Sequence, residues 1–354
     1  MKKIKSFKLY HLRWAVLCLL LVFVILPRCI NGIGECYAIY IYPVVSAALS
    51  GVASVLPFSL TETTVILVVI WLLAFPFYAA KRKKGWKYIA VREVELVLWV
   101  YVWFYLGWGM NYFRDSFYRR MEVPVAQYDE SRFKVFIAGY ADSINHAYTM
   151  KSDLSKLEVE KEVKRIYYAL PEAWGLTRPL SFQHPKRSLV NALYSKVGVL
   201  GYMGPFFAES HVNHDLLPMQ YPFTYAHELS HLLGVSSEAE ANFWAYQVCT
   251  HSTQPYIKYS GYFELFAHVV NNAYALLSEK DFREWIKTIR PEIIAERKKQ
   301  SDYWEALYSP TIGALQNTIY DFYLKGNRIA SGRKNYGQVI ALILSLPDDW
   351  TLCQ

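Results

Sequence analysis

The segment that decides the architecture of this chain is His227-Glu228-Leu229-Ser230-His231, followed closely by Ser236-Ser237-Glu238-Ala239-Glu240-Ala241-Asn242. Residues four apart lie on one face of a helix, so a helix over the first stretch presents the imidazoles of His227 and His231 to a single metal ion. Glu228 then reaches toward a water bound to that metal. This spacing is the HExxH pattern, and it predicts a Zn²⁺ site with His227 and His231 as ligands and Glu228 as the catalytic base.

Two short helices are expected around this pattern. Pro222 is unsuited to a helix interior, whereas residues 223–233 contain no helix breaker and Gly234 can end a helix in the left-handed conformation. Ser237 followed by Glu240 has the spacing of a capping box, which begins a second helix. The sequence therefore predicts a tight helical hairpin that carries the site.

A zinc site of this kind needs a third protein ligand, and Glu238 and Glu240 are the two candidates in the hairpin. The capping box gives Glu240 a structural role, because its carboxylate can accept from the backbone N–H of Ser237. We therefore favour Glu238 as the third metal ligand, with Glu240 as the alternative. Asn242 lies four residues after Glu238 on the same helix face and can orient a metal ligand by a hydrogen bond, without binding the metal itself.

These residues carry a family resemblance. The run from Glu238 to Asn242 after an HExxH resembles the glutamate-containing helix of gluzincin membrane peptidases, in which a Glu-x-x-Ala-Asp pattern supplies the third zinc ligand; Glu238 then matches the ligand and Asn242 replaces the aspartate. The chain is more closely similar to a bacterial membrane family called domain of unknown function 3810, grouped with the HExxH peptidases. That resemblance rests on Gly204-Pro205-Phe206, Glu209-Ser210-His211-Val212-Asn213, Pro222-Phe223-Thr224, the HExxH, Glu240-Ala241-Asn242-Phe243, Tyr320-Asp321-Phe322-Tyr323-Leu324-Lys325 and Asn335-Tyr336-Gly337. It implies a gluzincin-like zinc metallopeptidase with a zincin-like domain, and it implies no substrate.

The composition indicates a membrane anchor. Hydrophobic residues make up 53% of the chain and charged residues 19%, with the apolar excess in the first 110 residues. We expect a membrane anchor over residues 1–110 with three transmembrane helices, at about 14–30, 62–80 and 92–110. The uncharged run 37–56 is interpreted as a re-entrant or interfacial segment.

Charge predicts the orientation of this anchor and excludes one class of partner. Residues 1–13 and 81–87 each carry five basic residues and no acidic residue, so both should face the cytoplasm. Three crossings then place residues 111–354 outside the cytoplasmic (inner) membrane of a multi-pass protein whose N-terminus is cytoplasmic. Those ten basic residues exceed the net charge of +8, which leaves 28 basic and 30 acidic residues elsewhere. Because no basic domain remains, the expected partners are the lipid bilayer and a peptide or protein substrate, and no nucleic acid.

Residues 111–354 are long enough for one globular domain, expected to be mainly α with a small β element. Helical periodicity covers residues 159–169, 263–277, 281–299 and 303–324, and extended structure is expected within 195–212. A hairpin in that last range would precede the motif helix and could bind an extended substrate by strand addition.

Several polar residues near the motif have open roles. His211 and His214 precede the HExxH and could hydrogen-bond a reaction oxyanion, act in a second metal site, or be ordinary loop histidines. Tyr202 and Tyr336 are weaker candidates for oxyanion donors. The sequence predicts a membrane-anchored zinc-dependent metallopeptidase that uses a metal-activated water on the extracytoplasmic side. The alternative is a membrane sensor or interaction protein that retains a zinc-binding or degenerate HExxH site.

Overall fold

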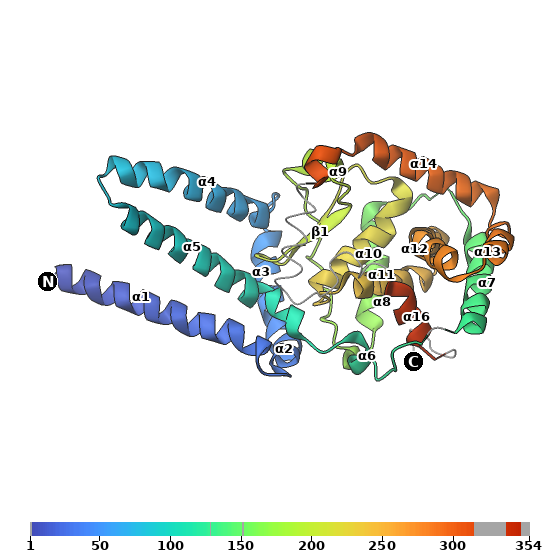
Figure 1. Cartoon of the computed structure of the whole chain (residues 1–354), viewed down its shortest axis with the longest axis horizontal. Coiled ribbons are helices and arrows are strands. Elements are labelled where there is room, and N and C mark those ends of the chain that lie inside the picture. Colours follow the sequence, from blue (N-terminus) through green and yellow to red (C-terminus); the bar gives the residue numbers. More distant parts are fainter. Residues whose placement is uncertain (1, 128, 151, 315–337, 348–354) are drawn as a thin grey trace. The chain divides into compact units, whose positions relative to one another are not determined.

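The computed structural model of the chain describes residues 2–127, 129–150, 152–314 and 338–347 (Figure 1). The described part is mainly helical and contains one two-stranded sheet, which confirms the predicted fold class. The chain divides into two units. The first comprises residues 1–115 with 204–209, and the second comprises 116–203 with 210–354.

The first unit is built from long apolar helices. Its elements are α1 (Lys2–Ile25), α2 (Ile33–Cys36), α3 (Tyr42–Ser54), α4 (Leu60–Lys81) and α5 (Trp86–Gly107), with short 3₁₀ or π turns at Leu26–Arg28, Tyr37–Ile41 and Gly109–Phe113. Helix α5 packs against both α1 and α4. The N-terminal end of α1 and the turn between α4 and α5 lie at the same end of this unit (Figure 1), so both basic segments of the sequence are at that end.

Among the described residues, three segments are long and apolar enough to cross a membrane: Tyr10–Arg28, Ile33–Ser54 and Leu60–Lys81. The first and third coincide with the crossings expected at 14–30 and 62–80. The crossing expected at 92–110 falls on α5, which is outside this set and carries four charged residues in its first half. The range expected to be re-entrant, 37–56, instead falls largely on Ile33–Ser54, which is in the set. These segments indicate a membrane protein.

An ion-pair cluster around a buried carboxylate joins α1 to α5. Glu95 is only 4% exposed, and its carboxylate lies 2.5 Å from Arg13 Nε and 2.9 Å from Arg92 Nη1. Two cations on one carboxylate neutralise a charge that would otherwise be costly between apolar helices. This pairing explains how α5 can carry charged residues and still pack on α1.

The second unit holds the HExxH segment and the sheet. Its elements are α6 (Phe117–Arg120), α7 (Glu130–Ala147), α8 (Lys156–Ala169), α9 (Asn191–Lys196), β1 (Gly201–Gly204), β2 (Glu209–Val212), α10 (Tyr221–Leu232), α11 (Glu238–Thr250), α12 (Pro255–Leu276), α13 (Glu279–Ile286), α14 (Pro291–Leu307) and α16 (Val339–Ser345), with 3₁₀ turns at Glu172–Trp174 and Pro218–Gln220. The tip of the β1–β2 hairpin, residues 204–209, is the part that belongs to the first unit.

The core of this unit forms around α10, α11 and α12. Helix α11 packs against both α10 and α12, and its rings Phe243 and Trp244 are fully buried. Helix α8 covers α10, where the Tyr167 hydroxyl donates to the carbonyl of Ala226 at 2.8 Å. The residue before His227 is therefore held by both packing and a buried hydrogen bond, which makes α10 a rigid platform.

Most of the expected elements are found, with shifted boundaries. Helix α8 covers 159–169 and α12 covers most of 263–277, while the range 195–212 contains the end of α9 and both strands. The range 281–299 is helical but divided between two helices: α13 ends at Ile286 and Pro291 begins α14, because proline removes a helical hydrogen bond from any position after the first turn. Of the helix expected over 303–324, α14 reaches Leu307, and the part beyond residue 314 lies outside the described residues.

Candidate metal centre

Helix α10 presents His227 and His231 on one face because they are one turn apart. The sequence predicts a helix that starts after Pro222. In the structure the helix begins at Tyr221, so Pro222 lies inside its first turn. A proline in the first turn costs no hydrogen bond because that N–H has no partner within the helix. Gly234 follows the helix with a φ of 98°, which confirms the predicted left-handed stop.

Helix α11 begins directly after Ser237, whose hydroxyl accepts from the backbone N–H of Glu240 at 3.4 Å. The Glu240 carboxylate is engaged elsewhere. Its two oxygens lie 2.5 and 2.6 Å from Arg120 Nη2, and one of them accepts from Trp244 Nε1 at 3.0 Å. Both charged side chains are buried. Glu240 therefore has a structural role, as expected, but with Arg120 as its partner.

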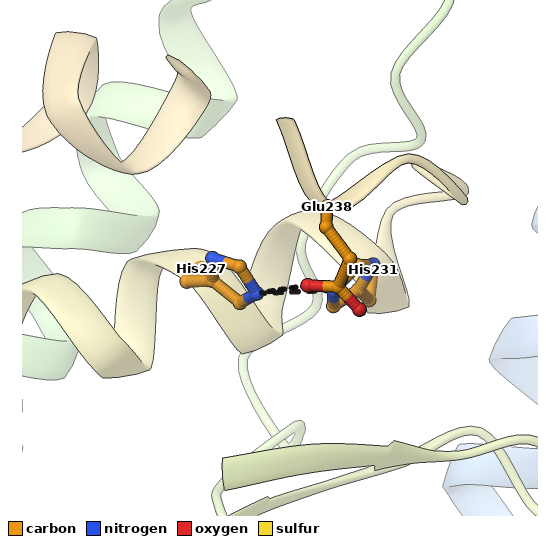
Figure 2. Close-up of side chains that lie close together, drawn as sticks. All are labelled: His227, His231 and Glu238. Carbon is orange, nitrogen blue, oxygen red and sulfur yellow. Dashed lines mark hydrogen bonds and ion pairs between the residues drawn. The ribbon is translucent and has the colours of Figure 1, made fainter. Parts of the chain in front are cut away.

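Glu238 turns toward the two histidines (Figure 2). The Nε2 atom of His227 lies 3.1 Å from Glu238 Oε2 and 3.1 Å from His231 Nε2, and His231 Nε2 lies 3.6 Å from Glu238 Oε2. These three residues form a group that could hold a metal ion, and no other such group occurs in the ranges that the structure describes. The structure thus brings together the three predicted ligands, and Glu240 is not among them.

The outer nitrogen of each imidazole is bound by the protein. His227 Nδ1 donates to Asn242 Oδ1 at 2.8 Å, and His231 Nδ1 donates to the carbonyl of Val235 at 2.8 Å. A neutral imidazole whose Nδ1 donates has a lone pair on Nε2. With both imidazoles neutral, the two Nε2 lone pairs face the Glu238 carboxylate, and these three electron-rich groups repel one another unless a metal ion or a proton lies among them.

The electrostatics of the site also favour a positive charge at this position. Burial alone would lower the pKa of His231, but the Glu238 carboxylate outweighs burial and raises that pKa to about 9. Burial alone would raise the pKa of Glu238, yet His231 and His227 hold it well below its usual range. The pair therefore keeps a proton on His231 at neutral pH when no other cation is bound.

Glu228 lies beside this group with an unsatisfied oxygen. The side chain is 4% exposed, and its Oε2 atom has no hydrogen-bond partner in the described part of the chain. Burial, reinforced by the charge of Glu238, raises its pKa to about 7 against the opposing effect of the histidines. A buried carboxylate with a pKa near neutrality can both accept and return a proton at physiological pH.

Strand β1 passes directly over Glu228. A Cβ atom at Gly201 would lie 2.7 Å from both Cγ and Oε1 of Glu228, so only glycine fits at this position. In the described sheet β1 pairs with β2 alone, whereas β2 also bridges to Lys186. β1 is therefore the edge strand, and it lies next to the carboxylate.

The other polar candidates lie away from the metal-binding group. The ring of Tyr202 stacks on His211 with centroids 4.2 Å apart, and because side chains alternate along a strand, both rings lie on the face opposite the one that Gly201 turns to Glu228. His214 is held through its backbone N–H by Asn191 at 2.9 Å. Neither histidine belongs to the group that could hold a metal. Tyr336 lies outside the described residues.

Three contributors to the site were missed from the sequence: Arg120, Val235 and Gly201. Arg120 lies 120 positions from its partner Glu240, and Val235 acts through its carbonyl oxygen, so neither gives a local side-chain signal. Gly201 does give one, because an isolated glycine in a predicted strand often marks the close approach of another group.

Comparison with known families places this site in context. The family model described as "Protein of unknown function (DUF3810)" matches residues 37–344, which is most of the chain, and the chain belongs to this family. The matched range includes the whole candidate metal centre. Neither the curated proteins nor the solved structures contain a match to this chain.

Proposed function

We propose that this protein is a membrane-anchored, zinc-dependent metallopeptidase with a gluzincin-like site. The observation that carries the proposal is the convergence of His227 Nε2, His231 Nε2 and Glu238 Oε2 beside a buried glutamate with an unsatisfied oxygen. His227, His231 and Glu238 would hold the zinc, and Glu228 would be the catalytic base.

The donor set suits zinc in chemistry and in spacing. Two imidazoles and one carboxylate are a common set of protein ligands for catalytic zinc, and they leave a fourth position open. In a tetrahedral site with bonds of about 2.0–2.2 Å, neighbouring ligand atoms lie about 3.3–3.6 Å apart. The three separations here are 3.1, 3.1 and 3.6 Å, so a shift of a few tenths of an ångström accommodates the ion.

Bound zinc would supply Lewis-acid activation of a water molecule and of the scissile carbonyl. Glu228 would be the residue that takes a proton from a water molecule in the site, through its unsatisfied Oε2, and returns it to the leaving amine nitrogen. Asn242 and Val235 hold the two imidazoles so that Nε2 faces inward throughout.

The edge strand offers a place for the substrate. An extended peptide can pair with the open edge of β1, which runs over Glu228, and this pairing would align a peptide bond near the metal through backbone hydrogen bonds. Recognition through the backbone favours peptides or unfolded segments of proteins as substrates.

We further propose that α1, α4 and α5 cross the cytoplasmic membrane, and that the segment 37–56 lies in the interface. Support comes from α5 packing between α1 and α4, from the neutralisation of Glu95 by Arg13 and Arg92, and from the two basic segments at one end of the unit (Figure 1). With those segments in the cytoplasm, the second unit is extracytoplasmic.

The test compares the full chain with its Glu228→Gln variant in detergent, using a mixture of unstructured peptides and mass spectrometry of the products. We expect cleavage that a chelator abolishes, loss of turnover in Glu228→Gln with zinc retained, and loss of both in His227→Ala. Glu172→Gln is the matched control, because Glu172 is an exposed surface carboxylate. Full peptidase activity in Glu228→Gln would sink the assignment.

A further inference from the structure

The β1–β2 hairpin is shared between the two units. Its tip, residues 204–209, belongs to the unit of apolar helices, while the rest of both strands belongs to the unit that holds the candidate metal centre. Each end of the hairpin makes specific contacts within its own unit.

Within the first unit, Glu209 caps helix α4. Its carboxylate accepts from the backbone N–H groups of Thr61 at 2.7 Å and Leu60 at 3.1 Å, and from the Ser59 hydroxyl at 3.3 Å. Glu209 is 3% exposed. The first-turn N–H groups of a helix have no partner within the helix, so α4 is completed by a residue that lies about 150 positions later in the chain.

The same tip is also fixed to α5. Trp103 Nε1 donates to the carbonyl of Phe206 at 2.8 Å, and the Trp103 ring packs against Phe207 with centroids 5.9 Å apart. Gly107 allows close approach, because a Cβ there would lie 2.8 Å from the Pro205 carbonyl oxygen. Helices α4 and α5 thus both hold the six-residue tip, 204–209.

Within the second unit, the start of the hairpin touches the proposed catalytic base. Gly201 lies against Glu228, and the preceding residues are fixed by Asn213, which donates to the carbonyls of Leu200 and Val199 at 2.8 Å each. Only Tyr202 and Met203 separate Gly201 from Gly204, the first residue of the tip. Strand β1 is therefore a short covalent link from the contacts of α4 and α5 to those of Glu228.

From these contacts we infer that the apolar helices α4 and α5 set the position of β1 over Glu228, with Glu209 as the positioning residue. The inference concerns regulation and rests on the proposed function: a change in the packing of α4 and α5 alters the alignment of the strand that holds substrate. Charge matters at Glu209 because all three of its partners are donors. A glutamine there would direct an amide N–H₂ group at one of them.

The test uses the full chain in detergent and compares Glu209→Gln, Trp103→Phe and the surface control Glu172→Gln. Hydrogen exchange is measured at the amides of Gly201, Tyr202 and Met203, together with zinc content and kcat. Glu209→Gln should speed exchange of these amides about tenfold or more and lower kcat by about 10- to 100-fold with zinc retained, since a misaligned site loses rate before it loses metal. Trp103→Phe should change the exchange rate and kcat in the same directions but by smaller factors. Glu172→Gln should leave the exchange rate and kcat unchanged.

Unchanged exchange at β1 in both Glu209→Gln and Trp103→Phe would overturn the inference, as would zinc loss in parallel with kcat, which indicates general destabilisation. If Glu209→Gln fails to fold, Trp103→Phe decides by the same readouts. The exchange measurement needs no turnover, so it tests the coupling even if the peptidase proposal fails, and a failure of that proposal is seen separately in Glu228→Gln.

Discussion

Glu238 and Glu240 are two residues apart on α11, and the structure gives them opposite roles that a matched pair of substitutions can separate. Glu238 faces both histidines, whereas Glu240 is buried against Arg120 and Trp244. We predict that Glu238→Gln loses metal and keeps its fold. We predict that Glu240→Gln keeps metal and loses stability.

The magnitudes follow from these surroundings. Removing one charge from a buried, hydrogen-bonded ion pair costs about 3–5 kcal/mol, and glutamine should lie near the lower limit because it still accepts one hydrogen bond from Arg120. For a unit of this size, about 3 kcal/mol lowers Tm by roughly 6–12 °C. Substituting residues that merely orient metal ligands weakens binding about 10- to 100-fold, so replacing the ligand Glu238 should weaken zinc binding by at least about 100-fold.

The assay is zinc content by mass spectrometry and thermal unfolding of the metal-free full chain, each measured for both variants. Arg120→Met combined with Glu240→Gln is the control, because removal of both charges should recover much of the lost stability without changing zinc content. If Glu240→Gln lost zinc while Glu238→Gln kept it, the assignment of the third ligand would be refuted.

Three further predictions concern the surroundings of the site. Asn242→Ala should weaken zinc binding about 10- to 100-fold without unfolding the chain, as measured by competition with a chelator; unchanged affinity would show that Asn242 does not orient His227. Gly201→Ala should reduce turnover and retain zinc because the added methyl group displaces Glu228, whereas Gly139→Ala, where a Cβ meets nothing within 4 Å, should be neutral; equal kinetics in both would contradict the crowding argument. The folded pKa of His231 is raised to about 9, so its contribution to the stability of the metal-free protein is present below pH 6.5 and is lost as the pH rises through 9. Zinc binding near pH 7 should therefore release about one proton, which calorimetry in buffers of different ionisation enthalpy measures. Release of no proton would contradict the pairing of His231 with Glu238.

The parts of the site that the sequence predicts are those that depend on local spacing. The one-turn separation of His227 and His231 fixes their common face, and the preference for Glu238 over Glu240 followed from the local competition for a capping role. A local capping role does not account for Glu240 fully, because its partner is the distant Arg120. Contacts between residues far apart in the sequence, such as Arg120 and Glu240, depend on tertiary packing and cannot be predicted from local spacing.

The membrane helices show the same limit. Apolar length identifies two of the expected crossings, 14–30 and 62–80, together with the segment 33–54, but hydropathy alone does not identify α5. The charges of α5 are compensated by Arg13 from another helix, so their cost depends on a contact that averaging along the sequence does not include. The hairpin tip capping α4 is likewise a long-range contact, between Glu209 and Thr61.

The central claim, that His227, His231 and Glu238 bind zinc, is tested most directly by measuring bound metal in the purified full chain and in its His231→Ala variant. The proposed geometry predicts about one zinc per chain in the parent protein and none in the variant. Absence of zinc from the parent protein after reconstitution, or equal zinc in both proteins, would contradict the claim and favour an interaction protein with a degenerate site.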